Sequence, residues 1–164
     1  MADEKQFSIQ RIYVKDVSFE SPNAPGLFAQ KWEPKVEFNL QSNAQKIQDD
    51  LYEVAITTTV TVKQSVTVQQ QDNSEKQTDN TAYLAEVCQA GVFLLKGFEE
   101  KEMGPMLGSF CPNVLFPYAR EAVSDLVTRG GFPPMLLSPV NFDAVYAQHM
   151  QNVQNQAQEN NTLN

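Results

Sequence analysis

The stretch "NVLFPYAREAVSDLVTRGGFPPMLLSPVNFDAVY", residues 113–146, carries two helical patterns separated by a connection rich in glycine and proline. In residues 113–129 apolar side chains recur every three or four positions, and the pair Gly130 and Gly131 then stops the helix. Asn141 is a residue type that caps helices, and it stands where the second pattern begins. The stretch therefore predicts two helices that close the fold.

The second helical pattern is amphipathic. Its apolar stripe follows the helical repeat and consists of Phe142, Val145, Tyr146, His149, Met150 and Val153. The composition of residues 151–164 is polar and rich in asparagine and glutamine, so we expect a disordered tail there. Residues 1–150 are then expected to form a single domain.

Four segments upstream of the helices have the composition of strands. In residues 9–19 the apolar parity switches midway, which predicts a bulge near Lys15. Residues 52–62 alternate most clearly and put their apolar side chains on one face. Residues 82–89 and 91–97 give a third and a fourth strand, and the short connections favour antiparallel pairing. The predicted fold class is α+β, with a four-stranded antiparallel sheet and two C-terminal helices.

Two connections in this expected sheet are unusual. Residues 20–50 include several prolines and also large apolar side chains, so we expect a long irregular segment that packs on the rest of the fold. The polar patch "QDNSEKQTDN", residues 71–80, predicts a hairpin loop.

The composition narrows the classes of partner and compartment. The chain has 164 residues, a formal net charge of −8 and a pI near 4.6, which argues against nucleic acid and against an anionic membrane surface. No apolar run is long enough to span a membrane, and the first residues lack the pattern of a secretory signal. Two cysteines, Cys88 and Cys111, favour a reducing compartment over a disulfide scaffold. We therefore expect a cytoplasmic protein.

Residues that carry catalysis are scarce. His149 is the only histidine, and it falls on the apolar stripe of the last helix, which favours a packing role. Two isolated cysteines and one histidine do not make a zinc site, and "GPMLG", residues 104–108, lacks the lysine and the Ser/Thr of a phosphate loop. We expect no enzyme activity, no cofactor and no metal.

Two of the expected strands carry acidic residues on one parity. Asp16 and Glu20 share a parity on the first strand, while Leu84 and Glu86 share one on the third. If these strands lie close together, three carboxylates and a leucine form one outward patch. The pattern alone favours an ordinary solvated sheet face over a binding patch.

Three blocks of the chain resemble the SecB family of bacterial protein-export chaperones: "IQRIYVKDVSFESPNAP", "CPNVLFPYAREAVSDLVTRGGFP" and "LSPVNFDAVY". The similarity covers residues 7–150. It implies a crossover loop after the first strand and a homotetramer built as a dimer of dimers. It also implies an ATP-independent holdase that binds unfolded precursor proteins, keeps them competent for translocation and delivers them to the SecA export motor.

The same resemblance assigns roles to residues. The implied client groove contains Leu27, Phe28, Trp32, Phe142 and Tyr146. The implied SecA-binding residues are Asp16, Glu20, Leu84 and Glu86, which reverses the preference drawn from pattern alone. The implied tetramer positions are Ala85, Val87, Gln89, Leu115, Ala119, Ala122 and Leu126.

Two features depart from the family pattern: the hairpin at residues 63–81 is longer, and the tail is less acidic. The alternatives to a general export chaperone are a SecB-like adaptor or a chaperone dedicated to a single client. A small hydrolase would need His149 as its base.

Overall fold

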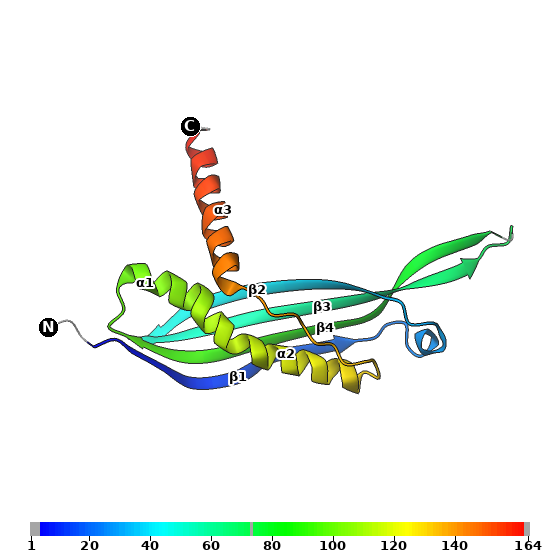
Figure 1. Cartoon of the computed structure of the whole chain (residues 1–164), viewed down its shortest axis with the longest axis horizontal. Coiled ribbons are helices and arrows are strands. Elements are labelled where there is room, and N and C mark those ends of the chain that lie inside the picture. The colour runs from blue at the N-terminus through cyan, green and yellow to red at the C-terminus, as the bar shows by residue number, and fades with distance from the viewer. Residues whose placement is uncertain (1–3, 73, 163–164) are drawn as a thin grey trace.

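The computed structural model describes residues 4–72 and 74–162 and has a single four-stranded sheet with helices on one side (Figure 1). The strands are β1 (Gln6–Glu20), β2 (Pro34–Gln48), β3 (Leu51–Gln69) and β4 (Glu75–Lys96), in the spatial order β1-β4-β3-β2. All neighbouring pairs are antiparallel. The helical elements are η1 (Gly26–Ala29), α1 (Glu100–Pro105), the π-helical turn η2 (Met106–Phe110), α2 (Cys111–Arg129) and α3 (Phe142–Thr162). The four-stranded antiparallel sheet and the two long C-terminal helices confirm the predicted α+β class.

The core lies between α2 and one face of the sheet, here called the helix face. The alternating apolar side chains of β3 are completely buried there, including Val54, Ile56, Val60 and Val62. Leu115 and the other apolar side chains of α2 pack against them. The opposite side of the sheet, which α2 does not cover, is called the outer face below.

The strands differ from the sequence prediction in two places. Residues 34–48 form strand β2 instead of an irregular segment. The alternation of Val36, Phe38 and Leu40 with polar residues is a strand signal that the prediction overlooked. The expected third and fourth strands are one strand, β4. Gly91, directly after the expected break at residue 90, lies beneath α2, where an added Cβ would stand 3.0 Å from Leu115 and 2.9 Å from Phe93.

The connection from β1 to β2 crosses from one edge of the sheet to the other through η1. This is the crossover that the resemblance implied, shortened because β2 takes up its second half. The predicted bulge in β1 is confirmed, since the pairing shifts between Val14 and Asp16 and leaves Lys15 without a partner.

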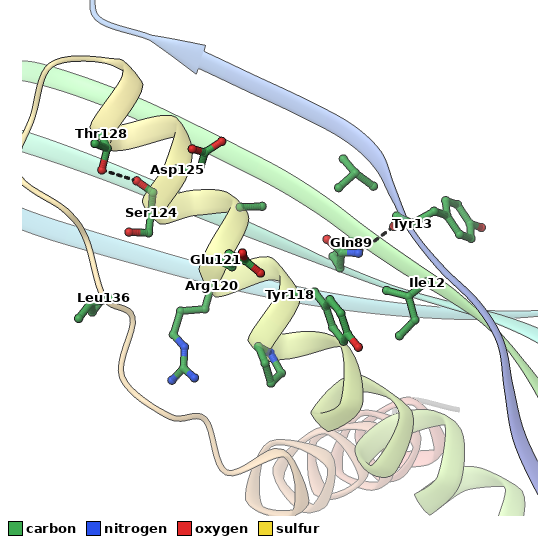
Figure 2. A pocket seen from close by; sticks show the side chains of 13 residues that line it. Ile12, Tyr13, Gln89, Tyr118, Arg120, Glu121, Ser124, Asp125, Thr128 and Leu136 are labelled. Carbon is green, nitrogen blue, oxygen red and sulfur yellow. Dashed lines mark hydrogen bonds between the residues drawn. The ribbon is translucent and has the colours of Figure 1, made fainter.

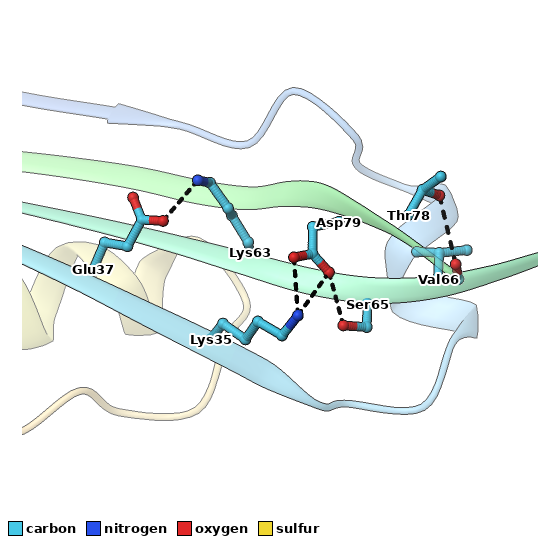
Figure 3. Close-up of polar contacts among 7 residues, drawn as sticks. All are labelled: Lys35, Glu37, Lys63, Ser65, Val66, Thr78 and Asp79. Carbon is cyan, nitrogen blue, oxygen red and sulfur yellow. Dashed lines mark hydrogen bonds and ion pairs between the residues drawn. The ribbon is translucent and has the colours of Figure 1, made fainter. Parts of the chain in front are cut away.

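The expected hairpin loop is a two-stranded ribbon. Pairing between β3 and β4 continues from Lys63 opposite Thr81 to Gln69 opposite Glu75, and the ribbon extends beyond the helices (Figure 1). Ion pairs between Lys35 and Asp79 and between Lys63 and Glu37 join its base to β2 (Figure 3). Position 73, inside the expected loop, lies outside the described residues.

The first helix begins earlier and the second ends later than predicted. α1 and η2 precede α2 without a break, and α2 starts at Cys111. Asn141 caps α3 as expected, since its Oδ1 accepts the backbone N–H of Ala144 at 3.0 Å. We expected disorder from residue 151 onward, whereas in the structure α3 continues to Thr162. The reason is that neither glycine nor proline interrupts residues 142–162; residues 163–164 lie outside the described part.

Candidate functional site

The outer face brings the predicted acidic residues together. In the β1–β4 ladder Asp16 pairs with Cys88, and Glu20 pairs with Leu84. Glu86 lies between these two rungs, opposite Ser18 on β1. Paired residues of antiparallel strands point to the same side, so the four predicted residues, here called the acidic face, form one outward group. Its members are Asp16, Glu20, Leu84 and Glu86.

The carboxylates of the acidic face are free of cations. Glu86 accepts a hydrogen bond from Thr59 Oγ1 at 2.8 Å, and within residues 4–72 and 74–162 the three carboxylates form no ion pair. The side chain of Leu84 is half-buried among them. Three uncompensated negative charges around an apolar side chain suit a partner with basic groups around an apolar one.

A polar cluster borders the acidic face on the same side of the sheet. Glu53 on β3 is only 9% exposed and accepts hydrogen bonds from Tyr13 Oη, from Lys15 Nζ at 2.7 Å and from Gln45 Nε2 at 2.9 Å. The hydrogen bond from Lys15, followed by that from Tyr13, holds the pKa of Glu53 below its ordinary value. Burial, followed by the hydrogen bond to Glu53, raises the pKa of Tyr13 to about 12. This cluster, called the Glu53 clamp below, therefore keeps its carboxylate charged and its tyrosine neutral.

An aromatic cluster gathers at the crossover, on the helix face. Phe132 lies at its centre, with ring centroids of Tyr83 at 4.7 Å, Phe28 at 5.3 Å and Trp32 at 5.5 Å. Leu27 is buried beside them, whereas Phe28 is 51% exposed. The three predicted groove residues of the crossover thus lie together, and one of them presents a large apolar surface to solvent.

An apolar groove lies along the β2 edge of the sheet. Its cavity of about 370 Å³ lies between β2, with Val36 and Phe38, and the connection of residues 135–140 that leads from α2 to α3. Leu136 in that connection is 78% exposed. Leu136 was not among the predicted groove residues, although the apolar run "MLL" between prolines was a visible signal.

The two groove residues predicted on α3 lie elsewhere. Phe142 is buried against Phe116 of α2, with ring centroids 5.7 Å apart. Tyr146 packs against Gly104 and Gly108, where an added Cβ would overlap its ring. Tyr146 therefore fixes α3 to the segment α1–η2, and the structure does not bring it to the aromatic cluster of the crossover.

The predicted tetramer positions divide into two groups. Five of them are buried within the single chain, in the contact between β4 and α2: Ala85, Val87, Gln89, Leu115 and Ala119. Ala122 and Leu126 are half-buried.

The solvent side of α2 faces a cavity of about 890 Å³ beside β1 (Figure 2). Among its lining residues, Tyr118 is 47% exposed and Leu136 is again present.

The chain's candidate catalytic residues are not assembled. His149 is exposed on α3, while Cys111 is completely buried, and burial raises the pKa of its thiol to about 12. In residues 4–72 and 74–162 no cluster of acidic, histidine and cysteine side chains suits a metal ion. None of the helices in this part of the chain has the length and apolar character needed to cross a membrane.

Comparisons with known proteins agree with one another. Residues 1–153 match the family model described as preprotein translocase subunit SecB. The chain is 60% identical to the protein-export protein SecB of Methylococcus capsulatus over 94% of this chain and 92% of that protein. It is 53% identical to the protein of the same name from Nitrosococcus oceani, over 90% and 84% of the two chains. It is 50% identical to the protein-export protein SecB of Pseudomonas fluorescens, over 91% of this chain and 86% of that protein.

Among solved structures, a SecB-like chaperone of Mycobacterium tuberculosis in complex with a peptide of an antitoxin shares the fold. Its TM-score is 0.55 at 22% identity, over 82% of this chain and 90% of that chain.

Proposed function

The chain belongs to the SecB family of protein-export chaperones, and on that premise we propose that its two surfaces divide the work of export between them. The apolar groove and the aromatic cluster capture unfolded precursor proteins without ATP. The acidic face then docks the loaded chaperone on the SecA motor. Proteins of this family are chaperones and not enzymes, so the work is done by binding alone.

The observation that carries the proposal is the separation of the two surfaces. The exposed apolar side chains of the crossover and of β2 lie on the helix face or its edge, while the free carboxylates lie on the outer face. A client in the groove therefore leaves the acidic face open to the motor.

Capture in the groove follows from apolar burial. Covering one exposed anchor such as Phe28 or Leu136 yields roughly 1.5–3 kcal/mol, part of which is spent on ordering the flexible client. Binding of a client to a single groove is therefore weak. We propose that the chain acts as a homotetramer in the cytoplasm, in which several grooves hold one long client and retain it by avidity.

The choice of clients is then kinetic. At an association rate constant of about 10⁶–10⁷ M⁻¹s⁻¹ and ~1 μM chaperone, capture takes place at roughly 1–10 per second. Proteins that fold faster than this escape, and slowly folding precursors are held.

Two single substitutions test the division of work. Glu86→Lys reverses one charge of the acidic face, and we expect it to abolish SecA binding while a reduced, unfolded precursor is still captured. Phe28→Ala removes an exposed anchor, and we expect it to weaken precursor capture severalfold while SecA binding stays at the wild-type level. Titration of each variant with SecA and with the precursor measures both properties.

The outcome also separates the alternatives. Loss of both bindings in either variant would contradict the division of work. Binding of one folded partner with no affinity for unfolded precursors would favour an adaptor, and capture of a single precursor among many would favour a dedicated chaperone.

A further inference from the structure

The bulge in β1 determines which face the acidic residues occupy. Before Lys15 the even-numbered Ile12 and Val14 pair with Gly91 and Gln89 on the helix face. After it, the odd-numbered side chains take the helix face and the even-numbered ones turn outward, among them Asp16 and Glu20. Without the extra residue, the period of two would turn both carboxylates toward the helix side.

Side chains bond to the bulge from both faces of the sheet. On the helix face Gln89 Nε2 donates to the carbonyl oxygen of Tyr13 at 3.0 Å, as Figure 2 shows. On the outer face Glu53 accepts hydrogen bonds from Tyr13 and Lys15, the residues before and at the bulge. Gln45 adds a bond from β2, so the Glu53 clamp joins three strands.

The clamp reaches across an intervening strand. β4 lies between β1 and β3, and its residue at this point is Ala90, the Cα partner of both Tyr13 and Ala55. A methyl group leaves room for the side chains of β1 to cross over it to Glu53.

The clamp also controls a cation. Lys15 Nζ lies 2.7 Å from Glu53, and Lys15 is the neighbour of Asp16 in the chain. With Glu53 neutralised, the ammonium group is free to approach Asp16 and to compensate its charge.

We propose that Glu53 is a positioning residue for the docking face. By bonding to Tyr13 ahead of the bulge and to Lys15 within it, Glu53 fixes the face that Asp16 and Glu20 occupy, and it keeps the cation of Lys15 away from the acidic face. This inference rests on the proposed docking of SecA, and it adds residues that lie outside the acidic face.

The first measurement is the affinity for SecA. Glu53→Gln keeps the shape of the side chain and removes its charge, and we expect the dissociation constant to rise about tenfold, the size of a charge-assisted hydrogen bond. Precursor capture should not change. The matched control is Glu102→Gln, which also removes a carboxylate bound to a lysine at 2.7 Å, in a pair remote from the outer face; it should leave the affinity for SecA unchanged.

The second measurement reports the register itself. Asp16→Cys places a thiol opposite the native Cys88, and Cα partners in antiparallel strands are close enough for a disulfide. Under mild oxidation this bond should form readily in the Asp16→Cys protein and about fivefold more slowly when Glu53→Gln is added. A variant that is less stable but still folded in the native register would form this disulfide at the unchanged rate.

The outcomes are distinguishable. Wild-type affinity for SecA together with an unchanged rate of disulfide formation in Glu53→Gln would overturn the inference. If Glu20→Lys also leaves SecA binding unchanged, the docking face itself is wrong. If Glu53→Gln does not fold, Tyr13→Phe removes one bond of the clamp without unpairing a charge, and about a twofold loss of affinity is expected from it.

Discussion

Lys15 has no Cα partner in the β1–β4 ladder, and this extra residue sets which side chains of the following segment the outer face presents. The switch of apolar parity in residues 9–19 predicted the bulge from sequence, and the parity of Asp16 and Glu20 followed from it. The partner of the bulge was not predictable in this way. Glu53 comes from β3, and its contact with β1 depends on a strand order and a register that local patterns do not contain.

The charge of Glu53 predicts how stability depends on pH. At pH 7 we expect Glu53→Gln to lower the free energy of unfolding by about 1–3 kcal/mol, because a mostly buried carboxylate loses its charge-assisted bonds. The folded-state pKa of Glu53 lies below its ordinary value, so its contribution is complete above that value and is lost as the pH falls through the lowered pKa. Urea unfolding should therefore give curves for the wild type and Glu53→Gln that converge below about pH 4.

A control separates the clamp from ordinary surface charge. Glu102→Gln breaks an exposed pair with Lys5 and should cost no more than about 1 kcal/mol at any pH. Curves for the wild type and Glu53→Gln that stay parallel from about pH 7 to pH 3 would contradict the assigned role of the Glu53 charge.

At the scale of elements, the direction of α3 is set by its first turns. Phe142 inserts beside Phe116, Asp143 accepts a hydrogen bond from Ser109, and Tyr146 packs on Gly104 and Gly108. Beyond these contacts the helix stands away from the sheet with its apolar side chains exposed (Figure 1). The glycines of "GPMLG" thus make room for an aromatic ring.

Gly104 and Gly108 form a notch that holds the ring of Tyr146, and a methyl group in this notch should detach α3 from it. Gly108→Ala places a Cβ 2.4 Å from a ring carbon of Tyr146, so we expect α3 to detach and the free energy of unfolding to fall by about 1–3 kcal/mol. Limited proteolysis should then cut the connection before Phe142 faster than in the wild type. The control is Gly26→Ala, whose Cβ would meet nothing within 4 Å; equal proteolysis of both variants would refute the notch.

The elements also show where sequence reasoning succeeds and fails. β3 was predictable because one of its faces is buried and the other is not, which gives strict alternation. β2 was missed although its first half alternates in the same way, because Pro22, Pro25 and Pro34 around it favour an irregular segment. The ribbon was missed because its polar residues resemble those of a loop, while its pairing depends on the neighbouring strand. The groove at Leu136 was missed because it forms only when the connection between α2 and α3 lies against β2.

At the scale of the whole molecule, the sheet separates two kinds of chemistry. Apolar side chains at the crossover and at β2 remain exposed on one side, and uncompensated carboxylates remain exposed on the other. Both arrangements cost stability in an isolated chain, and both become favourable when a partner covers them. The surface of α2 beside β1 is a third exposed region, and it supports the proposal that copies of the chain assemble there.

Light scattering on the purified protein, alone and after dilution of an unfolded, slowly folding precursor into it, measures both assembly and capture. We expect the mass of one tetramer, a rise by the mass of one client, and a delay in the refolding of that client. A monomer that leaves refolding unchanged would rule out a tetrameric holdase.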